Sequence, residues 1–271
     1  MTLCVYHGNC ADGFGAAWVV WKALGDIEFF AGTYQEDPPD VTGKDVILVD
    51  FSYKRPVLLK MAADAKSILI IDHHKTAMED LTDLPSNVKT KFDMTHSGAV
   101  LTFKHFFPNE DVPKLLLHIE DRDLWKFALK NTREIQANVF SYPYDFSVWD
   151  KLINSDLDKL SLEGEAIERK HFKDINELLT VTTREMYIAG YKIPVANLPY
   201  TMSSDAGHIL AKGKPFAACY WDTPTGRVFS LRSSNEGFDV SEIAKKYGGG
   251  GHRNAAGFKV SFEEATLFEI K

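Results

Sequence analysis

Short apolar runs alternate with amphipathic stretches along the first half of the chain. The apolar runs predict strands over residues 3–7, 27–32, 45–50 and 67–72. The other stretches have the spacing of helices, over residues 12–25, 56–65, 96–107 and 112–125. Strands and helices that alternate in this way are typical of an α/β fold, with a mostly parallel sheet and helices on both of its faces.

The pattern changes beyond residue 160. Residues 161–181 carry an apolar stripe between charged positions, which predicts a helical connector. Strand-like runs follow over residues 192–198, 215–221 and 227–232. We therefore expect a first domain over 1–160, a connector helix over 161–181 and a smaller mixed α/β domain over 182–271.

The composition is that of a soluble globular protein. Of the 271 residues, 45% are apolar, which is enough to bury a substantial core in two modest domains. No apolar run approaches the roughly 20 residues that span a bilayer, and the first residues lack the basic flank of a secretory signal. The three cysteines form no CxxC pair, which argues against a disulfide framework. A cytoplasmic protein without a membrane partner is expected.

The net charge of -7 argues against a protein that coats long duplex DNA, because such binding depends on many Lys and Arg contacts to phosphates. The charge is unevenly distributed. Residues 1–181 contain 20 Lys and Arg against 29 Asp and Glu, whereas residues 182–271 contain 11 against 9. The acidic part suits cation binding, and the mildly basic part suits an anionic substrate.

Acidic and imidazole groups stand where the predicted strands end. His7, Asp50 and Asp72 each terminate an apolar run. Because open parallel sheets bind ligands outside the carboxyl ends of their strands, these groups are expected to gather at one edge. Asp72 also begins the tripeptide Asp72-His73-His74. Taken alone, this tripeptide has a plain alternative, a polar loop whose histidines are solvated.

A glycine-rich turn over residues 7–15 joins the first strand to the first helix and contains His7 and Asp12. Glycine lets the backbone come close to a ligand, and these two side chains suit hard divalent cations. The alternative is an ordinary turn in which Asp12 caps the helix.

Two acidic residues, Asp121 and Asp123, close the helix over 112–125. A charged cluster on a helix is usually a solvated face. An Asp beside Leu124 and Trp125 is nevertheless expected to be partly buried and to need a partner. Asp121 and Asp123 are alternative candidates for a functional role.

A second glycine-rich segment begins at Gly248, near the C-terminus. Its exposed backbone N–H groups, with the imidazole and guanidinium that follow, can hold a phosphate or a terminal nucleotide. A flexible linker is the alternative, but residues 252–258 do not have the composition of a Gly/Ser spacer. The segment therefore predicts a substrate-binding loop that contains Gly249, Gly250, Gly251, His252 and Arg253.

Together these motifs resemble the DHH phosphoesterase family, in the form that carries a C-terminal DHH-associated domain. The matches follow one another at residues 7–16, Asp50, residues 72–74, Asp121 and residues 248–258. The family includes oligoribonucleases, single-strand exonucleases, cyclic-dinucleotide phosphodiesterases, pyrophosphatases and exopolyphosphatases. The resemblance implies two divalent ions as cofactors, Mn²⁺ first, with Mg²⁺ or Co²⁺ as alternatives.

The resemblance also implies roles for individual residues. The ligands of one metal ion are Asp12, Asp50, His73 and Asp121. Asp50 bridges to a second ion, which His7 also binds. His74 faces the substrate phosphate, and Asp72 orients one of the histidines by a hydrogen bond.

One position departs from the family. The usual motif has an Asp two residues before the equivalent of Asp12, where this chain has Cys10, and the spacing from His7 is one residue shorter. A thiolate prefers softer metals than Mn²⁺ or Mg²⁺. The second ion is therefore expected to bind more weakly than the first.

These features predict an enzyme, a metal-dependent phosphoesterase that cleaves the end of a short single-stranded oligonucleotide. Arg232 and the loop at His252 are expected to hold the part of the substrate that is not cleaved. The candidates to stack a base are Tyr220, Trp221 and Phe238. The alternatives are a phosphohydrolase for polyphosphate, pyrophosphate or a small nucleotide, and an inactive relative that only holds single strands. The sequence leaves the oligomeric state open, a homodimer included.

Overall fold

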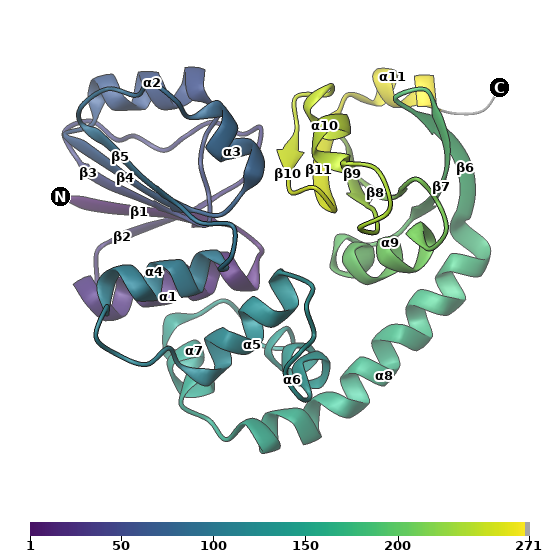
Figure 1. The fold of residues 1–271 in the computed structure, drawn as a ribbon, viewed down its shortest axis with the longest axis horizontal. Helices are drawn as coiled ribbons and strands as arrows, with labels where there is room; N and C mark the ends of the chain where they lie inside the picture. The colour runs from purple at the N-terminus through teal and green to yellow at the C-terminus, as the bar shows by residue number, and fades with distance from the viewer. Residues whose placement is uncertain (269–271) are drawn as a thin grey trace. The chain divides into compact units, whose positions relative to one another are not determined.

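Five parallel strands form the central sheet of the N-terminal unit of the computed structural model, which describes residues 1–268. The strands lie in the order β2-β1-β3-β4-β5 (Figure 1). Their bounds are Thr2–His7 (β1), Glu28–Gly32 (β2), Asp45–Val49 (β3), Ser67–Asp72 (β4) and Val88–Phe92 (β5). The parallel sheet expected from the alternating pattern is confirmed.

Helices cover both faces of this sheet (Figure 1). On one face lies α2, and on the other lie α1 and α4, with α5, α6 and α7 beyond them. The helices of the unit are Ala11–Leu24 (α1), Arg55–Asp64 (α2), Lys75–Asp80 (α3), Gly98–Phe106 (α4), Lys114–Asp123 (α5), Thr132–Val139 (α6) and Phe146–Ile153 (α7).

Successive residues of a central strand face two different cores. In β3, Val46 and Leu48 join the core beneath α2, whereas Ile47 and Val49 join the core with α1 and α4. Burial on both faces explains why the strand is an unbroken apolar run. The edge strand β5 is not an apolar run, because its residues 89–91 are exposed. The apolar pattern therefore did not predict this strand.

The second unit contains a six-stranded mixed sheet in the order β10-β11-β9-β8-β7-β6. Strands β7 and β8 are parallel, and the other neighbours are antiparallel. The strands are Thr183–Ile188 (β6), Tyr191–Asn197 (β7), Ala217–Thr223 (β8), Gly226–Arg232 (β9), Gly250–Gly251 (β10) and Ala255–Val260 (β11). The helices are Ser203–Ala211 (α9), Val240–Lys245 (α10) and Phe262–Ala265 (α11), with 3-10 turns at Tyr200–Met202 (η1) and Thr266–Phe268 (η2). The mixed α/β class expected for the second domain is confirmed.

One long helix, Leu157–Thr182 (α8), contains the point at which the chain divides into its two units, after Arg169. The predicted connector over 161–181 lies within α8. The last three residues of the predicted second domain lie outside the described residues.

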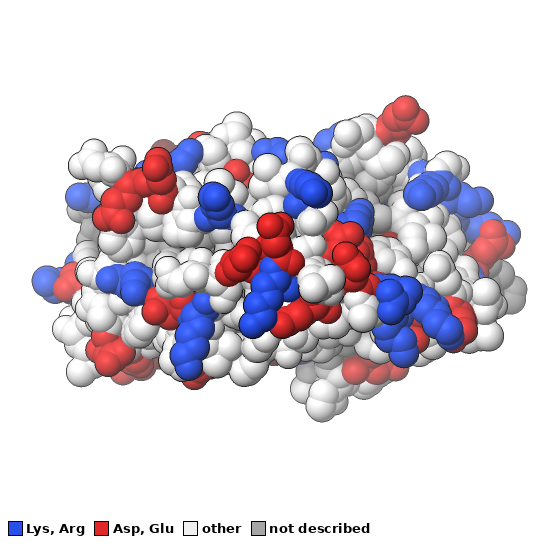
Figure 2. Space-filling model, turned by 90° about the horizontal axis from the view of Figure 1, so that it is seen from below, with Lys and Arg blue, Asp and Glu red and all other residues white. Residues whose placement is uncertain are grey.

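Along α8, lysines pair with acidic residues four positions away, as in Lys159–Glu163 and Lys170–Asp174. Figure 2 shows basic and acidic side chains interleaved on one face of the protein. Among residues 1–268, no helix combines the length and the apolar character needed to cross a bilayer.

Candidate metal centre and substrate-binding loop

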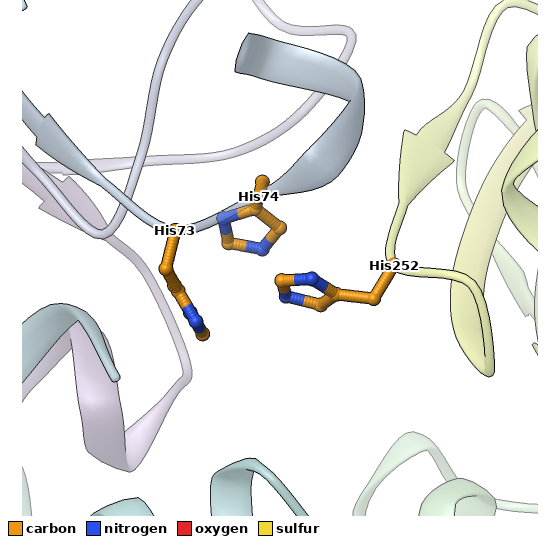
Figure 3. Close-up of side chains that lie close together, drawn as sticks. All are labelled: His73, His74 and His252. Carbon is orange, nitrogen blue, oxygen red and sulfur yellow. The ribbon is translucent and has the colours of Figure 1, made fainter. Parts of the chain in front are cut away.

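The carboxyl ends of β1, β3 and β4 lie side by side in the sheet. Hydrogen-bonded register pairs Tyr6 with Val49 and Val49 with Ile71, so the residues after them emerge at one edge. The strand order also reverses between β1 and β3, which is where open α/β sheets form their ligand crevices. His7, Asp50 and the tripeptide Asp72-His73-His74 all stand at this edge. Figure 3 shows the two histidines of the tripeptide where the chain leaves β4 for α3.

One nitrogen atom, Nε2 of His73, faces three carboxylates. It lies 3.0 Å from Asp50 Oδ1, 3.6 Å from Asp12 Oδ2 and 3.5 Å from Asp123 Oδ2. His73, Asp12 and Asp50 are each only 1% exposed. Asp123 is more exposed and lies at the outer side of the cluster. Two buried carboxylates and a third at the rim around a single imidazole leave an excess of negative charge.

The charges of this cluster act on one another. Burial raises the pKa of Asp12 well above its ordinary value, and the carboxylates of Asp50 and Asp123 raise it further. Burial also works to raise the pKa of Asp50, but close contacts with His7 and His73 outweigh it and hold that pKa well below the ordinary value. Burial works to lower the pKa of His73, but the carboxylates around it raise that pKa well above the usual range. Positive charge is therefore favoured at the centre of the cluster.

A second group of side chains shares Asp50 with the first. His7, Asp50 and His74 place ligand atoms close enough together to hold a metal ion. Nδ1 of His7 lies 3.5 Å from Asp50 Oδ2. Burial works to lower the pKa of His7, but contacts with Asp50 and Cys10 raise it well above the usual range. Cys10, the residue that departs from the family motif, thus stands beside His7.

Asp72 organises the tripeptide. Its Oδ1 atom lies 2.7 Å from Nδ1 of His74 and accepts hydrogen bonds from the backbone N–H groups of His73 and His74. Ser52 donates to the other carboxylate oxygen at 3.3 Å. Because an ionised carboxylate only accepts, this contact favours a proton on Nδ1 of His74.

Asp12 has two kinds of neighbour. Its carboxylate accepts hydrogen bonds from the backbone N–H groups of Gly98 and Ala99, at 2.6 and 3.0 Å. It therefore caps the N-terminus of α4, while it also faces His73. The alternative that Asp12 caps its own helix does not apply, since Asp12 lies inside the first turn of α1.

Asp50 has a left-handed backbone with φ of 52°, which is uncommon for residues other than glycine and is found at functional sites. Its backbone N–H donates to the carbonyl of Ile71, which ties it to β4. Gly98 leaves room for it, because a Cβ atom there would stand 2.6 Å from Asp50 Oδ1. Sequence reasoning did not single out Gly98.

Gly98→Ala is therefore expected to displace the Asp50 carboxylate and to lower hydrolysis on the order of 100-fold, as ligand misplacements of about 1 Å do. Steady-state kinetics on folded protein checks this. Gly164→Ala is a matched control, because its Cβ would collide with the carbonyl of Glu134 and not with a candidate ligand. Gly164→Ala should lower the free energy of unfolding and leave the rate of hydrolysis per folded molecule unchanged. Equal rates of hydrolysis for Gly98→Ala and Gly164→Ala would contradict the role of Gly98.

The structure does not bring Asp121 into the cluster, and this corrects its predicted place. Its carboxylate accepts hydrogen bonds from the backbone N–H groups of Ala128 and Leu129 and from the Thr132 hydroxyl. These partners tie it to the loop that follows α5 and to the first residue of α6. Asp123, the alternative, faces His73 instead.

The predicted substrate-binding residues lie together in the second unit. Strand register places Ala255 opposite Arg232, so the end of β9 adjoins the loop between β10 and β11. Gly251 has φ of 137°, a conformation that side chains rarely adopt, and a Cβ there would stand 2.6 Å from the carbonyl of Ala255. At Gly249 a Cβ would collide with the carbonyl of Gly257. Gly250 completes the short strand β10, and His252 follows it (Figure 3).

The two arginines of this region are held by neighbouring groups. Arg232 donates to the hydroxyls of Ser204 and Ser230, at 2.6 and 2.9 Å. Arg253 donates to the carbonyls of Asn235 and Gly237, at 3.4 and 3.2 Å. The guanidinium of Arg253 therefore stabilises the turn before α10.

The three candidate stacking residues differ in exposure. Tyr220 is only 6% exposed and packs in the core of the second unit, so it is not placed to stack a base. Trp221 is half-buried. Phe238 is 40% exposed.

Comparisons with known proteins agree with this architecture. The model of the DHHA1 domain matches residues 206–267. An uncharacterized protein of Acanthamoeba polyphaga mimivirus is 31% identical over 95% of this chain and 67% of its own length. Oligoribonuclease NrnB of Bacillus subtilis (strain 168) is 25% identical over 74% of this chain. This chain covers only 55% of that oligoribonuclease.

Two solved structures share the fold. An exopolyphosphatase-related protein from Bacteroides fragilis has a TM-score of 0.56 at 16% identity, over 98% of this chain and 88% of its own. RecJ from Thermus thermophilus, in complex with Mn²⁺, has a TM-score of 0.52 at 14% identity, over 98% of this chain and 50% of its own. With the DHHA1 match and the motifs at the strand ends, the chain belongs to the DHH family of phosphoesterases, which are hydrolytic enzymes.

Proposed function

We propose that this protein is a divalent-metal-dependent phosphodiesterase that hydrolyses the end of short single-stranded oligonucleotides. The observation that carries the proposal is the convergence of three carboxylates on Nε2 of His73, next to a second group that shares Asp50. A largely buried cluster with this excess of negative charge suits a metal cation better than it suits protons alone.

The donor set fits Mn²⁺ or Mg²⁺, because it consists of carboxylate oxygens and imidazole nitrogens. One ion would be held by Asp12, Asp50, His73 and Asp123. The other would be held by Asp50 with His7 and His74. Oδ1 of Asp50 supports this fit, since it is buried and forms no hydrogen bond of ordinary geometry within residues 1–268, although His73 Nε2 is 3.0 Å away. When bound, such ions activate water and neutralise charge on phosphoryl oxygens.

The chain's own residues then have distinct tasks. Asp72 would keep the proton of His74 on Nδ1, so that the lone pair of Nε2 could bind a metal ion. Asp12 holds the first residue of α4, Gly98, in place by a hydrogen bond, and Gly98 in turn leaves room for the Asp50 side chain. In the second unit, Arg232 and the loop from Gly249 to Arg253 hold the phosphates that are not cleaved.

The oligonucleotide substrate is favoured by two observations. The sequence relative from Bacillus subtilis is an oligoribonuclease. The second unit combines Arg232 with the half-buried Trp221 and the exposed Phe238, and cationic and aromatic side chains together bind single strands.

A substrate panel with added Mn²⁺ tests the proposal. It compares RNA and DNA oligomers of two to five nucleotides, phosphoadenosine phosphate, a cyclic dinucleotide, pyrophosphate and polyphosphate. Turnover highest on the oligomers is expected. Turnover confined to pyrophosphate or polyphosphate, or binding of oligomers without turnover, would overturn it.

Arg232→Ala is expected to raise KM for an oligonucleotide about 10- to 100-fold and to leave the affinity for Mn²⁺ unchanged, because a lost charge-assisted hydrogen bond costs roughly 1.5–3 kcal/mol. Arg227→Ala, at the other end of the same strand, removes an ion pair with Asp222 and a contact with the Tyr220 ring, and it is the matched control. Kinetics and metal titration of both variants check this. Loss of Mn²⁺ affinity in Arg232→Ala would contradict the proposal that Arg232 binds substrate and takes no part in metal binding.

A further inference from the structure

The loop after α5 has an unusual backbone. Trp125 and Phe127 both have positive φ, at 56° and 47°. Bulky side chains rarely adopt this conformation, and it persists only where surrounding contacts impose it. Both rings are half-buried rather than packed in the core. The fold therefore holds two large aromatic rings in place at a position where core packing does not explain them.

Asp121 supplies the contacts that impose this conformation. Its backbone carbonyl accepts hydrogen bonds from the N–H groups of Lys126 and Phe127, at 2.8 and 3.2 Å. Its carboxylate accepts from the next two N–H groups and from the Thr132 hydroxyl. The N–H of Trp125 donates to the carbonyl of Arg122 at 2.9 Å. Asp121 is thus a positioning residue for the aromatic loop.

Two guanidinium groups accompany the rings. Arg133 lies 3.7 Å from the ring centroid of Phe127 and 5.7 Å from that of Trp125, and Arg122 lies 5.9 Å from the Trp125 centroid. The two rings meet edge to face at 4.9 Å. Lys126, between them in the chain, is exposed. Rings interleaved with cations are the composition of surfaces that bind single-stranded nucleic acid.

This surface adjoins the metal centre within the first unit. Asp123 lies only two residues before Trp125 and 3.5 Å from His73. Arg122 directly precedes Asp123 in the chain and lies 5.9 Å from the Trp125 ring centroid, so it stands between the cluster and the rings. A nucleotide whose phosphate lies at the cluster would have its base within the reach of such a loop.

We propose that Arg122, Trp125, Phe127 and Arg133 form a nucleobase-stacking subsite beside the metal centre. The subsite holds the base of the nucleotide at the scissile phosphate, and Trp125 supplies its main stacking face. This inference rests on the proposed function, since it names how the same site recognises its substrate. It separates oligonucleotides, which carry bases, from polyphosphate, which does not.

Calorimetric binding tests the subsite with two probes, a phosphorothioate trinucleotide that resists hydrolysis and its abasic analogue, both with Mn²⁺. Trp125→Leu is expected to weaken binding of the base-containing probe roughly tenfold or more and to leave the abasic probe unchanged. Trp125→Phe should retain most of the affinity, with a loss of about threefold, and it serves as the test if the Leu variant does not fold. Trp21→Leu is the matched control, because Trp21 is another half-buried ring with a nearby cation, Lys22.

The subsite is contradicted if Trp125→Leu weakens binding of both probes equally or of neither. It is also contradicted if the wild-type protein binds the two probes with the same affinity. Hydrolysis of the unmodified trinucleotide is scored separately. If the protein binds the base-containing probe better but does not hydrolyse the trinucleotide, the proposed function is wrong and the subsite is supported. If it hydrolyses the trinucleotide but does not prefer the base-containing probe, the subsite is wrong and the proposed function is supported.

Discussion

Asp50→Asn is expected to reduce hydrolysis of a short oligonucleotide on the order of 1000-fold or more. Asp50 contacts both His7 and His73, so it belongs to both groups of candidate ligands. The amide lacks the negative charge that a divalent ion needs there. Loss of groups that merely orient metal ligands already costs roughly 10- to 100-fold, and loss of a shared ligand is expected to cost more.

Asparagine is the appropriate replacement because it tolerates the left-handed backbone that Asp50 adopts, so the fold should survive. Asp45→Asn is the matched control, since Asp45 begins the same strand and pairs at the surface with Lys66. Its activity should stay within about twofold of wild type, as expected for a surface ion pair. Steady-state kinetics and circular dichroism decide the comparison, and near-normal turnover by Asp50→Asn would refute the shared-ligand role.

Asp123→Asn and Asp121→Asn are expected to fail in different ways. Asp123 faces His73, so its loss should weaken Mn²⁺ binding and lower turnover on the order of 100-fold or more. Asp121 instead accepts hydrogen bonds from the loop after α5, so its loss should lower the free energy of unfolding by about 1–3 kcal/mol and leave Mn²⁺ affinity intact.

The pH dependence of stability adds a check on Asp121. Burial works to raise its pKa, but hydrogen bonds from Thr132 and from two backbone N–H groups lower that pKa below the ordinary value of 3.8. A depressed pKa stabilises the fold above 3.8, and the contribution is lost as the pH falls from there. The stability difference between wild type and Asp121→Asn should therefore shrink below pH 3.8. Equal loss of Mn²⁺ affinity in Asp121→Asn and Asp123→Asn would contradict the assignment.

The strand-end residues could be predicted because two simple rules apply to them. Apolar runs buried on both faces mark the central strands, and parallel strands bring their carboxyl ends to one edge. His7, Asp50 and the tripeptide from Asp72 therefore fall together once the sheet is recognised. The glycines after β1 and before β11 follow similar rules, because close backbone approach requires them.

The choice between Asp121 and Asp123 lay beyond such rules. Residues two positions apart point to nearly opposite sides of a helix, and packing of α5 decides which side faces the cluster. The Asp beside Leu124, Asp123, is exposed rather than buried, whereas Asp121 is 4% exposed and has loop amides and the Thr132 hydroxyl as partners. Gly98 was missed because its contact, Asp50, is 48 positions away in the chain and the pair meets only through tertiary packing.

Hydrolysis of a short single-stranded oligoribonucleotide before and after metal removal tests the central claim most directly. The protein is dialysed against excess EDTA and then against chelator-free buffer, and its initial rate is measured without and with added Mn²⁺. The cluster of Asp12, Asp50, His73 and Asp123 predicts no measurable hydrolysis by the stripped protein and recovery of the full rate with Mn²⁺. Full activity in excess EDTA would contradict a metal-dependent phosphodiesterase.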